Sequence, residues 1–299
     1  MTADQVPLSI VVGSNNARNS IVPCLSSLMG QRLEADVEII VVDNSTDGTA
    51  ELIRPHFPGV KLIAARPSAL IPELWAAGIH ESRGGIVAIT TAHCVPRQDW
   101  VRAILEAHDG SAAAVGGAVE NDDSTALVDW GVYLCRYTPY MLPFPASFVS
   151  EIAGDNASYP RSHIDRCRHI WKDGFWEPRV HAALRRAGFR LRLTPRMVVF
   201  HKKSFGVRGF IKQRFLHGMT FGRDRAAQLP GAWRLLYIAL SPTIPLVFLA
   251  RIARQVLIKA RHRSKLVLAL PILLLFLLAW ASGELIGYVR GPRTDDNVR

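Results

Sequence analysis

Short apolar runs alternate with amphipathic segments along the first two thirds of the chain. The clearest run is Glu38-Ile39-Ile40-Val41-Val42-Asp43, which ends in an acid and is followed by polar turn residues. A continuous Val/Ile run bounded in this way is typical of a buried strand in a parallel sheet. Further strands are predicted at 8–12, 60–65, 86–90 and 112–120, with helices at 20–28, 49–56, 72–82 and 99–108. This alternation predicts an α/β fold, in which helices cover both faces of a mostly parallel sheet.

The middle of the chain is less regular. An aromatic stretch over 130–148 is broken by prolines, and a helix is predicted at 178–187, with Pro178 at its first position and Gly188 after its end. Strands are predicted at 189–193 and 197–200. Glu177 therefore starts a helix, and His201 ends the last strand.

The last 70 residues have a different pattern. Residues 233–249 are apolar but carry Arg234, Pro242 and Pro245, residues 251–265 are basic, and residues 266–286 are a long apolar run. A run of about 20 apolar residues is long enough to cross a bilayer. We predict a cytosolic domain over 1–228 and a membrane-associated region over 229–299. Since basic loops favour the cytoplasmic side, 232–262 is expected to be interfacial or re-entrant, its basic part 251–262 a helix along the inner leaflet, and 266–288 the transmembrane helix.

Composition narrows the choice of partners. The 299 residues carry a net charge of +11, with a mean hydropathy of +0.13. This balance suits an anionic lipid or a phosphorylated substrate, and no nucleic-acid partner is expected because no nucleic-acid-binding motif is present. The four cysteines are scattered, which indicates reduced thiols. With no signal-peptide pattern, we expect the soluble part to face the cytoplasm at the inner (cytoplasmic) membrane. No Walker A loop and no dinucleotide-binding glycine pattern follows a strand.

Several motifs together resemble one enzyme family. They are Ser9-Ile10-Val11-Val12-Gly13-Ser14-Asn15-Asn16, Cys24-Leu25-Ser26-Ser27-Leu28, and Val41-Val42-Asp43 followed by Asp47-Gly48-Thr49. They resemble family 2 glycosyltransferases, which have the GT-A fold, and the resemblance extends over nearly all of 8–225. It implies transfer of a sugar, with inversion, from a UDP- or GDP-sugar. It further implies donor contacts for Ser14, Asn16 and Asp43, although an acid in the place of Asp43 is also a common turn cap.

The position of the family's Asp-x-Asp motif is occupied here by Thr91-Ala92-His93. In the family, these acids hold a divalent cation on the donor diphosphate. Thr91 supplies no carboxylate, whereas His93 offers a nitrogen, and His201 falls at another metal-ligating position of the family. Three interpretations stay open: a Mg²⁺ or Mn²⁺ site that uses His93 and His201, metal-independent transfer assisted by Arg and Lys, or a fold without activity. Thr91 and His93 are in each case expected beside the donor.

Trp176-Glu177-Pro178, followed by Leu184-Arg185-Arg186-Ala187-Gly188, resembles the family's catalytic segment. Counting back from Gly188 places Glu177 at the catalytic base, which deprotonates an acceptor hydroxyl. The alternative is that Glu177 only interacts with the helix dipole.

Two further segments complete the predicted site. Gly154-Asp155-Asn156-Ala157-Ser158-Tyr159 resembles the family's acceptor-side loop, so Gly154, Asp155, Asn156 and Trp176 are predicted to contact the acceptor. Arg214, in Gln213-Arg214-Phe215, is predicted to bind the donor phosphates, and it would equally suit a lipid headgroup.

The expected function is a membrane-anchored, inverting glycosyltransferase acting on a lipid-linked or membrane-proximal hydroxyl. Two alternatives remain open. One is an enzyme that loads sugar onto polyprenyl phosphate, which needs no base. The other is a non-catalytic protein that binds a sugar nucleotide or lipid on a degenerate scaffold.

Overall fold

A computed structural model describes residues 6–31, 36–122, 126–202 and 206–292. The chain divides into two compact units. The first contains residues 1–122 and 140–203, and the second contains residues 123–139 and 204–299.

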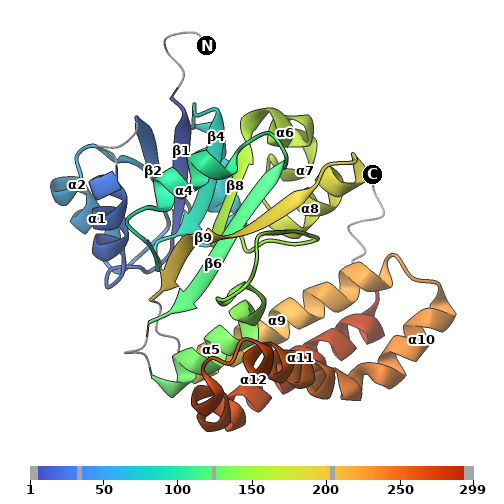
Figure 1. The fold of residues 1–299 in the computed structure, drawn as a ribbon. Helices are drawn as coiled ribbons and strands as arrows, with labels where there is room; N and C mark the ends of the chain where they lie inside the picture. Colours follow the sequence, from blue (N-terminus) through green and yellow to red (C-terminus); the bar gives the residue numbers. More distant parts are fainter. Residues whose placement is uncertain (1–5, 32–35, 123–125, 203–205, 293–299) are drawn as a thin grey trace. The chain divides into compact units, whose positions relative to one another are not determined.

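Within its described residues, the first unit is built on one nine-stranded sheet with the order β3-β2-β1-β4-β8-β6-β9-β5, with β7 also paired to β9 (Figure 1). The strands are β1 (Leu8–Ser14), β2 (Val37–Asp43), β3 (Lys61–Ala64), β4 (Ile86–Thr91), β5 (Cys94–Pro96), β6 (Ala114–Asn121), β7 (Ser147–Val149), β8 (Asn156–Pro160) and β9 (Leu191–His201). This arrangement confirms the predicted α/β fold class.

The half of the sheet that was predicted from Val/Ile runs is parallel. Strand β1 pairs in parallel with both β2 and β4, and the pairing extends from Leu8 opposite Val37 to Ser14 opposite Asp43. All seven residues of β1 are buried, because helices cover both faces of the sheet. A strand with no solvent-facing side needs no polar alternation, which explains the continuous apolar run.

The other half of the sheet is mixed. Strand β8 runs antiparallel to both β4 and β6, while β6 and β9 are parallel. Strand β9 is continuous across the two segments 189–193 and 197–200 that were predicted as separate strands. Pro195 interrupts the apolar pattern without ending the strand, because the register between β6 and β9 shifts between Gly116 and Ala118.

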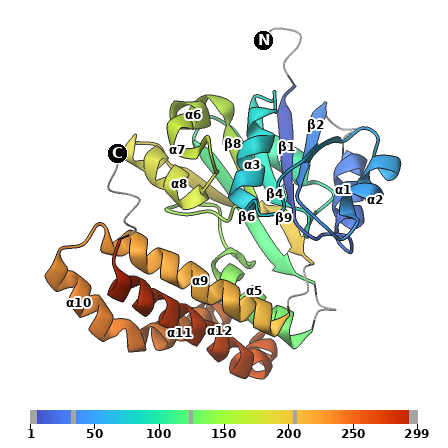
Figure 2. The same ribbon diagram turned by 180° about the vertical axis from the view of Figure 1, so that it is seen from behind.

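Helices pack on both faces of this sheet (Figure 2). On one face lie α1 (Ile21–Gln31) and α4 (Trp100–Ala107), which contact β5 and β9 respectively, and α2 (Thr49–His56) lies next to α1. On the other face, α3 (Ile71–His80), α6 (Arg161–Arg166), α7 (Arg168–Trp171) and α8 (Glu177–Arg186) share one apolar cluster. Trp75, Trp171 and Phe175 fill its centre.

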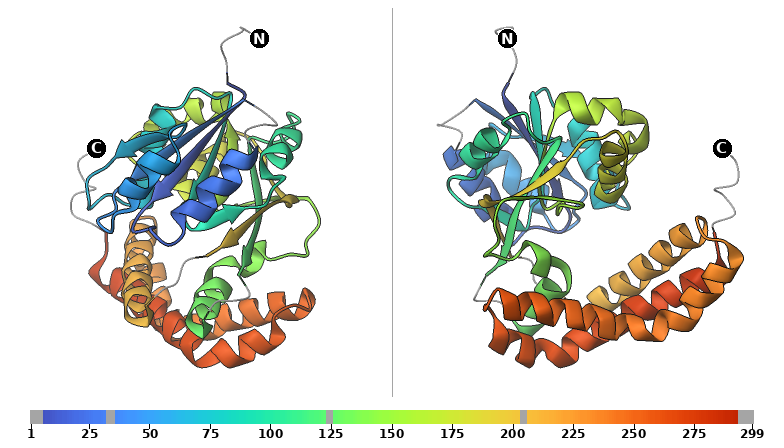
Figure 3. Two further views of the ribbon diagram at one scale, coloured as in Figure 1. Left: turned by 90° about the vertical axis from the view of Figure 1, so that its left-hand side faces the viewer. Right: turned by 45° about the vertical axis from the view of Figure 1, so that its right-hand side comes forward.

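The second unit is helical in its described residues. It contains α5 (Leu127–Tyr137), α9 (Val207–Ala226), α10 (Gly231–Leu240), α11 (Ile244–Ile258) and α12 (Arg263–Arg290), with short 3₁₀ turns η1 (Thr138–Tyr140) and η2 (Ser241–Thr243) after α5 and α10. Helix α12 packs against α5, α9, α10 and α11, so it is the central element of this unit (Figure 3).

Glycines bring α9 and α12 into contact at the level of their backbones. A Cβ atom at Gly218 would lie 2.3 Å from the carbonyl oxygen of Trp280, and one at Gly283 would lie 2.0 Å from that of Phe215. Gly222 and Gly287 make the corresponding contacts one turn further along. Both helices therefore carry a Gly-x-x-x-Gly pattern, which favours close helix packing in membranes because it lets backbones approach.

The boundaries between the two units therefore differ from the predicted boundary after residue 228. Helix α9 was assigned to the cytosolic domain 1–228, but its glycine face packs on α12 and it belongs to the second unit, as does α5. Helix α5 overlaps the aromatic stretch 130–148, and nothing in that sequence predicted that α5 would pack mainly against α12.

Two helical segments of the second unit are long and apolar enough to cross a membrane. They are Gly231–Ile258, which includes the turn η2, and Arg263–Arg290. The predicted transmembrane helix 266–288 lies inside α12. The predicted basic helix over 251–262 is shorter than expected: α11 ends at Ile258, and Ala260 and His262 take left-handed backbone conformations that separate it from α12. Crossing by one segment or by both stays a prediction.

Candidate functional site

The carboxyl ends of the first three paired strands bring the predicted donor residues together. Ser14, the last residue of β1, pairs with Asp43, the last of β2, and Gly13 pairs with Thr91, the last of β4. In open α/β sheets, ligands bind at this edge. The strand ends thus place Asp43 and Thr91 on either side of the end of β1.

The turn after β2 is fixed by its own polar side chains. Ser45 donates a hydrogen bond to Oδ1 of Asp43 at 2.6 Å, and Asn44 donates to the carbonyl oxygen of Ala69 at 2.7 Å. Asn16 has a positive φ of 47° and accepts a hydrogen bond from the backbone N–H of Thr46 at 3.1 Å. Asn16 and Asn44 therefore shape the turn, and the Asp43 carboxylate stands at its base, 5% exposed.

Ser14 is more deeply placed than its predicted donor contact requires. The whole residue is buried, and its hydroxyl finds no hydrogen-bond partner among the residues that the structure describes. A side chain with no exposed surface contacts a ligand only after the surrounding loop moves.

Trp75, which sequence reasoning did not single out, connects the strand ends to the rest of the site. Its Nε1 donates a hydrogen bond to the carbonyl oxygen of Thr90 at 2.7 Å. A Cβ atom at Gly13 would lie 3.2 Å from this Nε1, and one at Gly154 would lie 2.8 Å from the far edge of the ring. The indole is 3% exposed and packs between β1, β4 and the loop before β8.

Glu177 lies next to the same loop. It is the first residue of α8 and is partly exposed. A Cβ atom at Gly154 would lie 2.8 Å from its Oε1, so only glycine leaves room for the carboxylate. The structure thus brings together Gly154 and Glu177, which were predicted on the acceptor side and as the base. Trp176, immediately before Glu177, is 39% exposed.

A carboxylate from the turn before β8 reaches Thr91, which occupies a position of the expected Asp-x-Asp motif. Thr91 donates a hydrogen bond from Oγ1 to Oδ1 of Asp155 at 2.9 Å, and the hydroxyl of Thr90 donates to the backbone carbonyl of Asp155 at 2.8 Å. Asp155 is 8% exposed. It was predicted on the acceptor side, and in the structure it is bonded to the end of the donor-side strand β4.

Asn156 has a place in the core, in contrast to its predicted contact with the acceptor. It is fully buried as the first residue of β8. Its Oδ1 accepts a hydrogen bond from Nε1 of Trp100 at 2.8 Å, and its Nδ2 donates to the carbonyl oxygens of Ala118 and Met197. Most of the segment 154–159, which was predicted as a loop, belongs to strand β8 from Asn156 onward, because this amide satisfies backbone groups of β6 and β9.

His93 and His201 lie together. Strand β5 pairs with β9, with Cys94 opposite His201, and the two imidazole rings are 6.1 Å apart between centroids. Both side chains are mostly buried. Across the described ranges, however, no group of three or more His, Cys, Asp and Glu side chains could hold a metal ion. The donor set is thus two imidazoles, whereas Mg²⁺ and Mn²⁺ favour oxygen ligands. The described residues do not fit a complete protein-bound site for either cation.

A chain of hydrogen bonds, which runs from buried Tyr159 and His181 to exposed Glu151, supports the helix that carries Glu177. His181, one turn after Glu177, is hydrogen-bonded through Nε2 to the hydroxyl of Tyr159 at 2.9 Å and through Nδ1 to Oε2 of Glu151 at 3.0 Å. Burial raises the pKa of Tyr159, and the charges of Glu177 and Glu151 raise it further. Tyr159 therefore stays neutral and anchors α8 to β8. The sequence signal, a histidine at i+4 from a helix-starting acid, is too common to have been informative.

Arg214 is the one predicted donor residue that belongs to the second unit. It lies on α9, and its guanidinium stands over the ring of Trp280 at 4.2 Å from the centroid. The other predicted donor residues all belong to the first unit.

Comparisons with known proteins agree with this architecture. The profile described as Glycosyl transferase family 2 matches residues 9–167. A Methanococcus voltae protein, dolichyl N-acetyl-alpha-D-glucosaminyl phosphate 3-beta-D-2,3-diacetamido-2,3-dideoxy-beta-D-glucuronosyltransferase, is 24% identical, with 96% of this chain and 98% of that protein aligned. Two other curated relatives match at 28% and 32% identity, but the alignments span only 41% and 36% of their lengths.

Two solved structures show the same fold. Mannosyltransferase PcManGT from Pyrobaculum calidifontis, in complex with GDP-Man and Mn²⁺, matches with a TM-score of 0.58 at 20% identity, covering 95% of this chain and 88% of that one. S. aureus TarS 1–349 in complex with UDP-GlcNAc matches with a TM-score of 0.50 at 14% identity, covering 96% and 93%.

Because the family profile covers more than half of its residues, the chain belongs to glycosyl transferase family 2 and is a glycosyltransferase with a GT-A-like fold. The family assignment made from the short motifs is thereby confirmed.

Proposed function

We propose that this family 2 glycosyltransferase transfers a sugar, with inversion, from a nucleotide-diphosphate sugar to a hydroxyl of a lipid-linked acceptor. The observation that carries the proposal is the placement of Glu177. Its carboxylate lies against Gly154, in the loop before β8, and the neighbouring Asp155 of that loop accepts a hydrogen bond from Thr91 at the end of β4. Glu177 is the first residue of α8, so its carboxylate lies at the N-terminus of that helix, and it faces Gly154.

In the proposed reaction, Glu177 accepts the proton of the acceptor hydroxyl as its oxygen attacks the anomeric carbon. The new carbon–oxygen bond forms as the bond to the nucleoside diphosphate breaks on the opposite face, and the diphosphate departs with the electron pair. Trp75 and the chain from Tyr159 to Glu151 hold the base and its loop in position. Such positioning matters because a displacement of about 1 Å can cost a hundredfold in rate.

Asp43 is proposed to bind the nucleoside, since it ends a buried strand at the ligand-binding edge of the sheet. GDP-Man and UDP-GlcNAc are bound by the two similar solved structures, so the donor is proposed to be a GDP- or UDP-sugar. A divalent cation enters the proposal only as a companion of the donor diphosphate. His93 and His201 are the side chains that would contact such a cation, and no step depends on it here.

The acceptor and the anchor are proposed from the second unit and from the relatives. The two long apolar segments favour membrane attachment. The first unit is proposed to lie on the cytoplasmic side of the cytoplasmic membrane, because residues 251–265 are basic. The Methanococcus voltae relative acts, by its name, on a dolichyl-phosphate-linked sugar. A hydroxyl on a lipid-linked sugar is therefore the proposed acceptor, and it needs the base that Glu177 supplies.

The test replaces Glu177 with Gln in the full chain, in its native membrane or a nanodisc. This change keeps size and hydrogen bonding but removes basicity, so transfer is expected to fall about 10²–10⁴-fold while nucleotide affinity stays within twofold. Glu51→Gln is the matched control, because Glu51 also lies in the first turn of a helix and would show the same loss if only the dipole mattered.

Transfer at the parental rate by Glu177→Gln would contradict the base assignment and favour loading of sugar onto a polyprenyl phosphate. Binding of nucleotide sugars without turnover, across a panel of UDP- and GDP-sugars with native lipid extract, would favour the non-catalytic alternative.

A further inference from the structure

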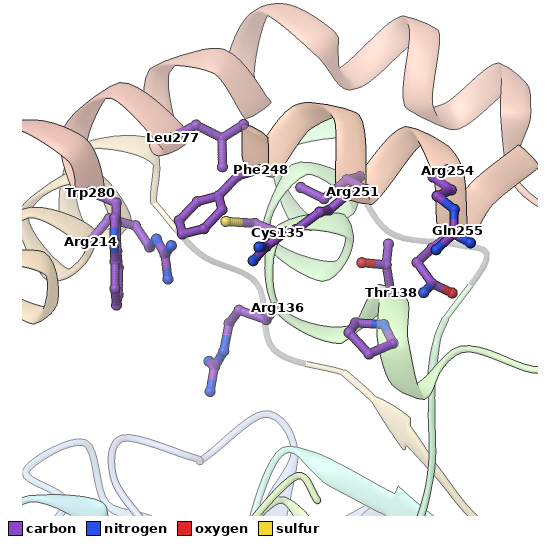
Figure 4. A pocket seen from close by; sticks show the side chains of 12 residues that line it. Cys135, Arg136, Thr138, Arg214, Phe248, Arg251, Arg254, Gln255, Leu277 and Trp280 are labelled. Atoms are coloured by element: carbon purple, nitrogen blue, oxygen red, sulfur yellow. The ribbon is translucent and has the colours of Figure 1, made fainter. Parts of the chain in front are cut away.

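The second unit contains a pocket that the proposed reaction does not use. Its volume is about 490 Å³, within the roughly 300–1,000 Å³ typical of small-ligand sites. Figure 4 shows side chains from α5, α9, α11 and α12 around it. All twelve lining residues belong to the second unit, so the pocket is complete within it.

Four arginines line the pocket, and none of its lining residues is acidic. Arg136 lies at the end of α5, Arg214 on α9, and Arg251 and Arg254 on α11. Arg251 and Arg254 make no ion pair with any described acid. Like charges brought together in this way repel one another, so an anion in the pocket would stabilise the unit.

The stabilising effect of an anion is expected to be greatest at Arg214. Its side chain is partly buried, and its Nε has no hydrogen-bond partner among the described residues. Burial lowers its pKa, and Arg136 lowers it further. The pKa of His217 on the same helix is lowered by burial and by these two arginines as well. An unneutralised guanidinium with an orphaned N–H in a low-dielectric place is costly, and a phosphate oxygen satisfies both its charge and its donor.

Apolar side chains also line the pocket. Phe248 and Ile252 come from α11, and Leu277 and Trp280 come from α12, the helices that are long and apolar enough to enter a membrane. An inorganic anion would gain no favourable contact from these apolar side chains. An amphiphile with a phosphorylated head and a hydrocarbon chain would find both arginines and apolar side chains in the lining of this pocket (Figure 4).

We propose that this pocket binds the phosphorylated end of a prenyl-type lipid, with its head on the arginines and the first part of its chain along Phe248 and Leu277. The proposal rests on the proposed function only for what the lipid is used for, namely to carry the acceptor sugar. The residues that form the binding site all belong to the second unit, so the site does not depend on the reaction assigned to the first unit. Arg214, predicted as a donor contact, is reassigned to this lipid.

The experiment measures binding to the full chain in nanodiscs of zwitterionic lipid, by calorimetry with farnesyl phosphate, inorganic phosphate and farnesol. Farnesyl phosphate is expected to bind at least tenfold more tightly than either fragment. The double variant Arg251→Gln/Arg254→Gln, whose side chains are exposed and so not needed for folding, is expected to weaken it at least tenfold. Arg208→Gln, an exposed arginine on α9 outside the pocket, is expected to change it less than twofold.

Other outcomes overturn the proposal. Equal affinity for phosphate and farnesyl phosphate would indicate a site for free anions. Equal competition by nanodiscs that contain phosphatidylglycerol would indicate a general contact with anionic headgroups. An unchanged affinity in both Arg251→Gln/Arg254→Gln and Arg214→Gln would remove the pocket from lipid binding.

The proposed function fails independently of this pocket. Nucleoside diphosphate affinity is expected to be unchanged in the double arginine variant, and Glu177→Gln is expected to bind farnesyl phosphate like the parent. Normal transfer by Glu177→Gln, together with intact farnesyl phosphate binding, would leave the pocket standing and change only the reaction assigned to the first unit.

Discussion

The two units treat their polar side chains in opposite ways. In the first, Asn156, His181 and Asp155 each find hydrogen-bond partners inside the fold. In the second, Arg214, Arg251 and Arg254 surround a pocket without an acid among its lining residues. A satisfied network fixes geometry, whereas an unneutralised cluster of one sign needs a ligand. The first arrangement suits catalysis, and the second suits the binding of an anionic ligand.

The units also differ in what holds their elements together. Strands of the first unit are joined by backbone hydrogen bonds along β1, β2 and β4, with side chains filling both faces. Helices α9 and α12 of the second unit approach until their glycines touch carbonyl oxygens. The first unit therefore depends on the fit of its side chains, and the second on the absence of side chains at four positions.

The largest effect is expected at the contact between loop and base. In Gly154→Ala, the new methyl group would overlap Oε1 of Glu177 and the ring of Trp75, both at 2.8 Å. Displacing the base should lower kcat about 10²-fold, with nucleotide affinity nearly unchanged. Gly85→Ala is the control, because its nearest atom is 3.8 Å away. Equal rates in the two variants would show that the base does not depend on this glycine.

Helix packing in the second unit is tested by Gly283→Ala. Its Cβ would lie 2.0 Å from the carbonyl oxygen of Phe215, and a backbone atom cannot rotate away. Overpacking of this kind costs about 1–3 kcal/mol, measured as a lower unfolding temperature in detergent. Gly209→Ala on α9, with no atom within 4 Å of its Cβ, should be neutral or slightly stabilising because alanine favours helix. Similar shifts for both would mean that α9 and α12 do not pack through these glycines.

Acid should destabilise the first unit through His108. This histidine is hydrogen-bonded to Oγ of Ser158 at 2.8 Å, and burial lowers its pKa from 6.5 to about 4. Between these values the unfolded chain binds the proton more readily, so stability is present above pH 6.5 and is lost as the pH falls toward 4. Between pH 7 and 5 the loss is roughly 2 kcal/mol. Denaturant titrations of the parent and His108→Gln should differ in this pH dependence, and parallel curves would contradict the assignment.

The smallest effect is expected in the chain that anchors α8. Tyr159→Phe removes one hydrogen bond to His181 and should cost about 1 kcal/mol. Since this bond positions the helix that starts at Glu177, transfer should fall a few-fold, with the acceptor KM nearly constant. A stability loss without any change in kcat would make the chain purely structural.

The sequence predicted best where one local pattern decides the structure. The strands β1, β2 and β4 follow from continuous apolar runs, and the site edge follows because Asp43 and Thr91 end two of them. The start of α8 at Glu177 follows from Pro178, whose ring suits the first turn. Gly188, with a φ of 84°, then ends that helix as predicted.

Features that depend on distant partners were not predicted. Strand β8 looked like a loop because its stability comes from the hydrogen bonds of Asn156 to β6 and β9. The role of Trp75 is set by Gly13 and Gly154, which are far from it in sequence. The arginine pocket draws on four helices, and only Arg214 of its four arginines was singled out.

The place of α12 near the end of the chain has a consequence for biosynthesis. Every strand of the first unit has been translated before α12 emerges from the ribosome, so the sheet can form early. Helices α5 and α9, in contrast, must wait for α12 to cover their packing faces. A chain interrupted before Arg263 would therefore hold the residues of the catalytic sheet yet expose both helices to chaperones and proteases, and quality control of this enzyme would depend on its last helix rather than on its active site.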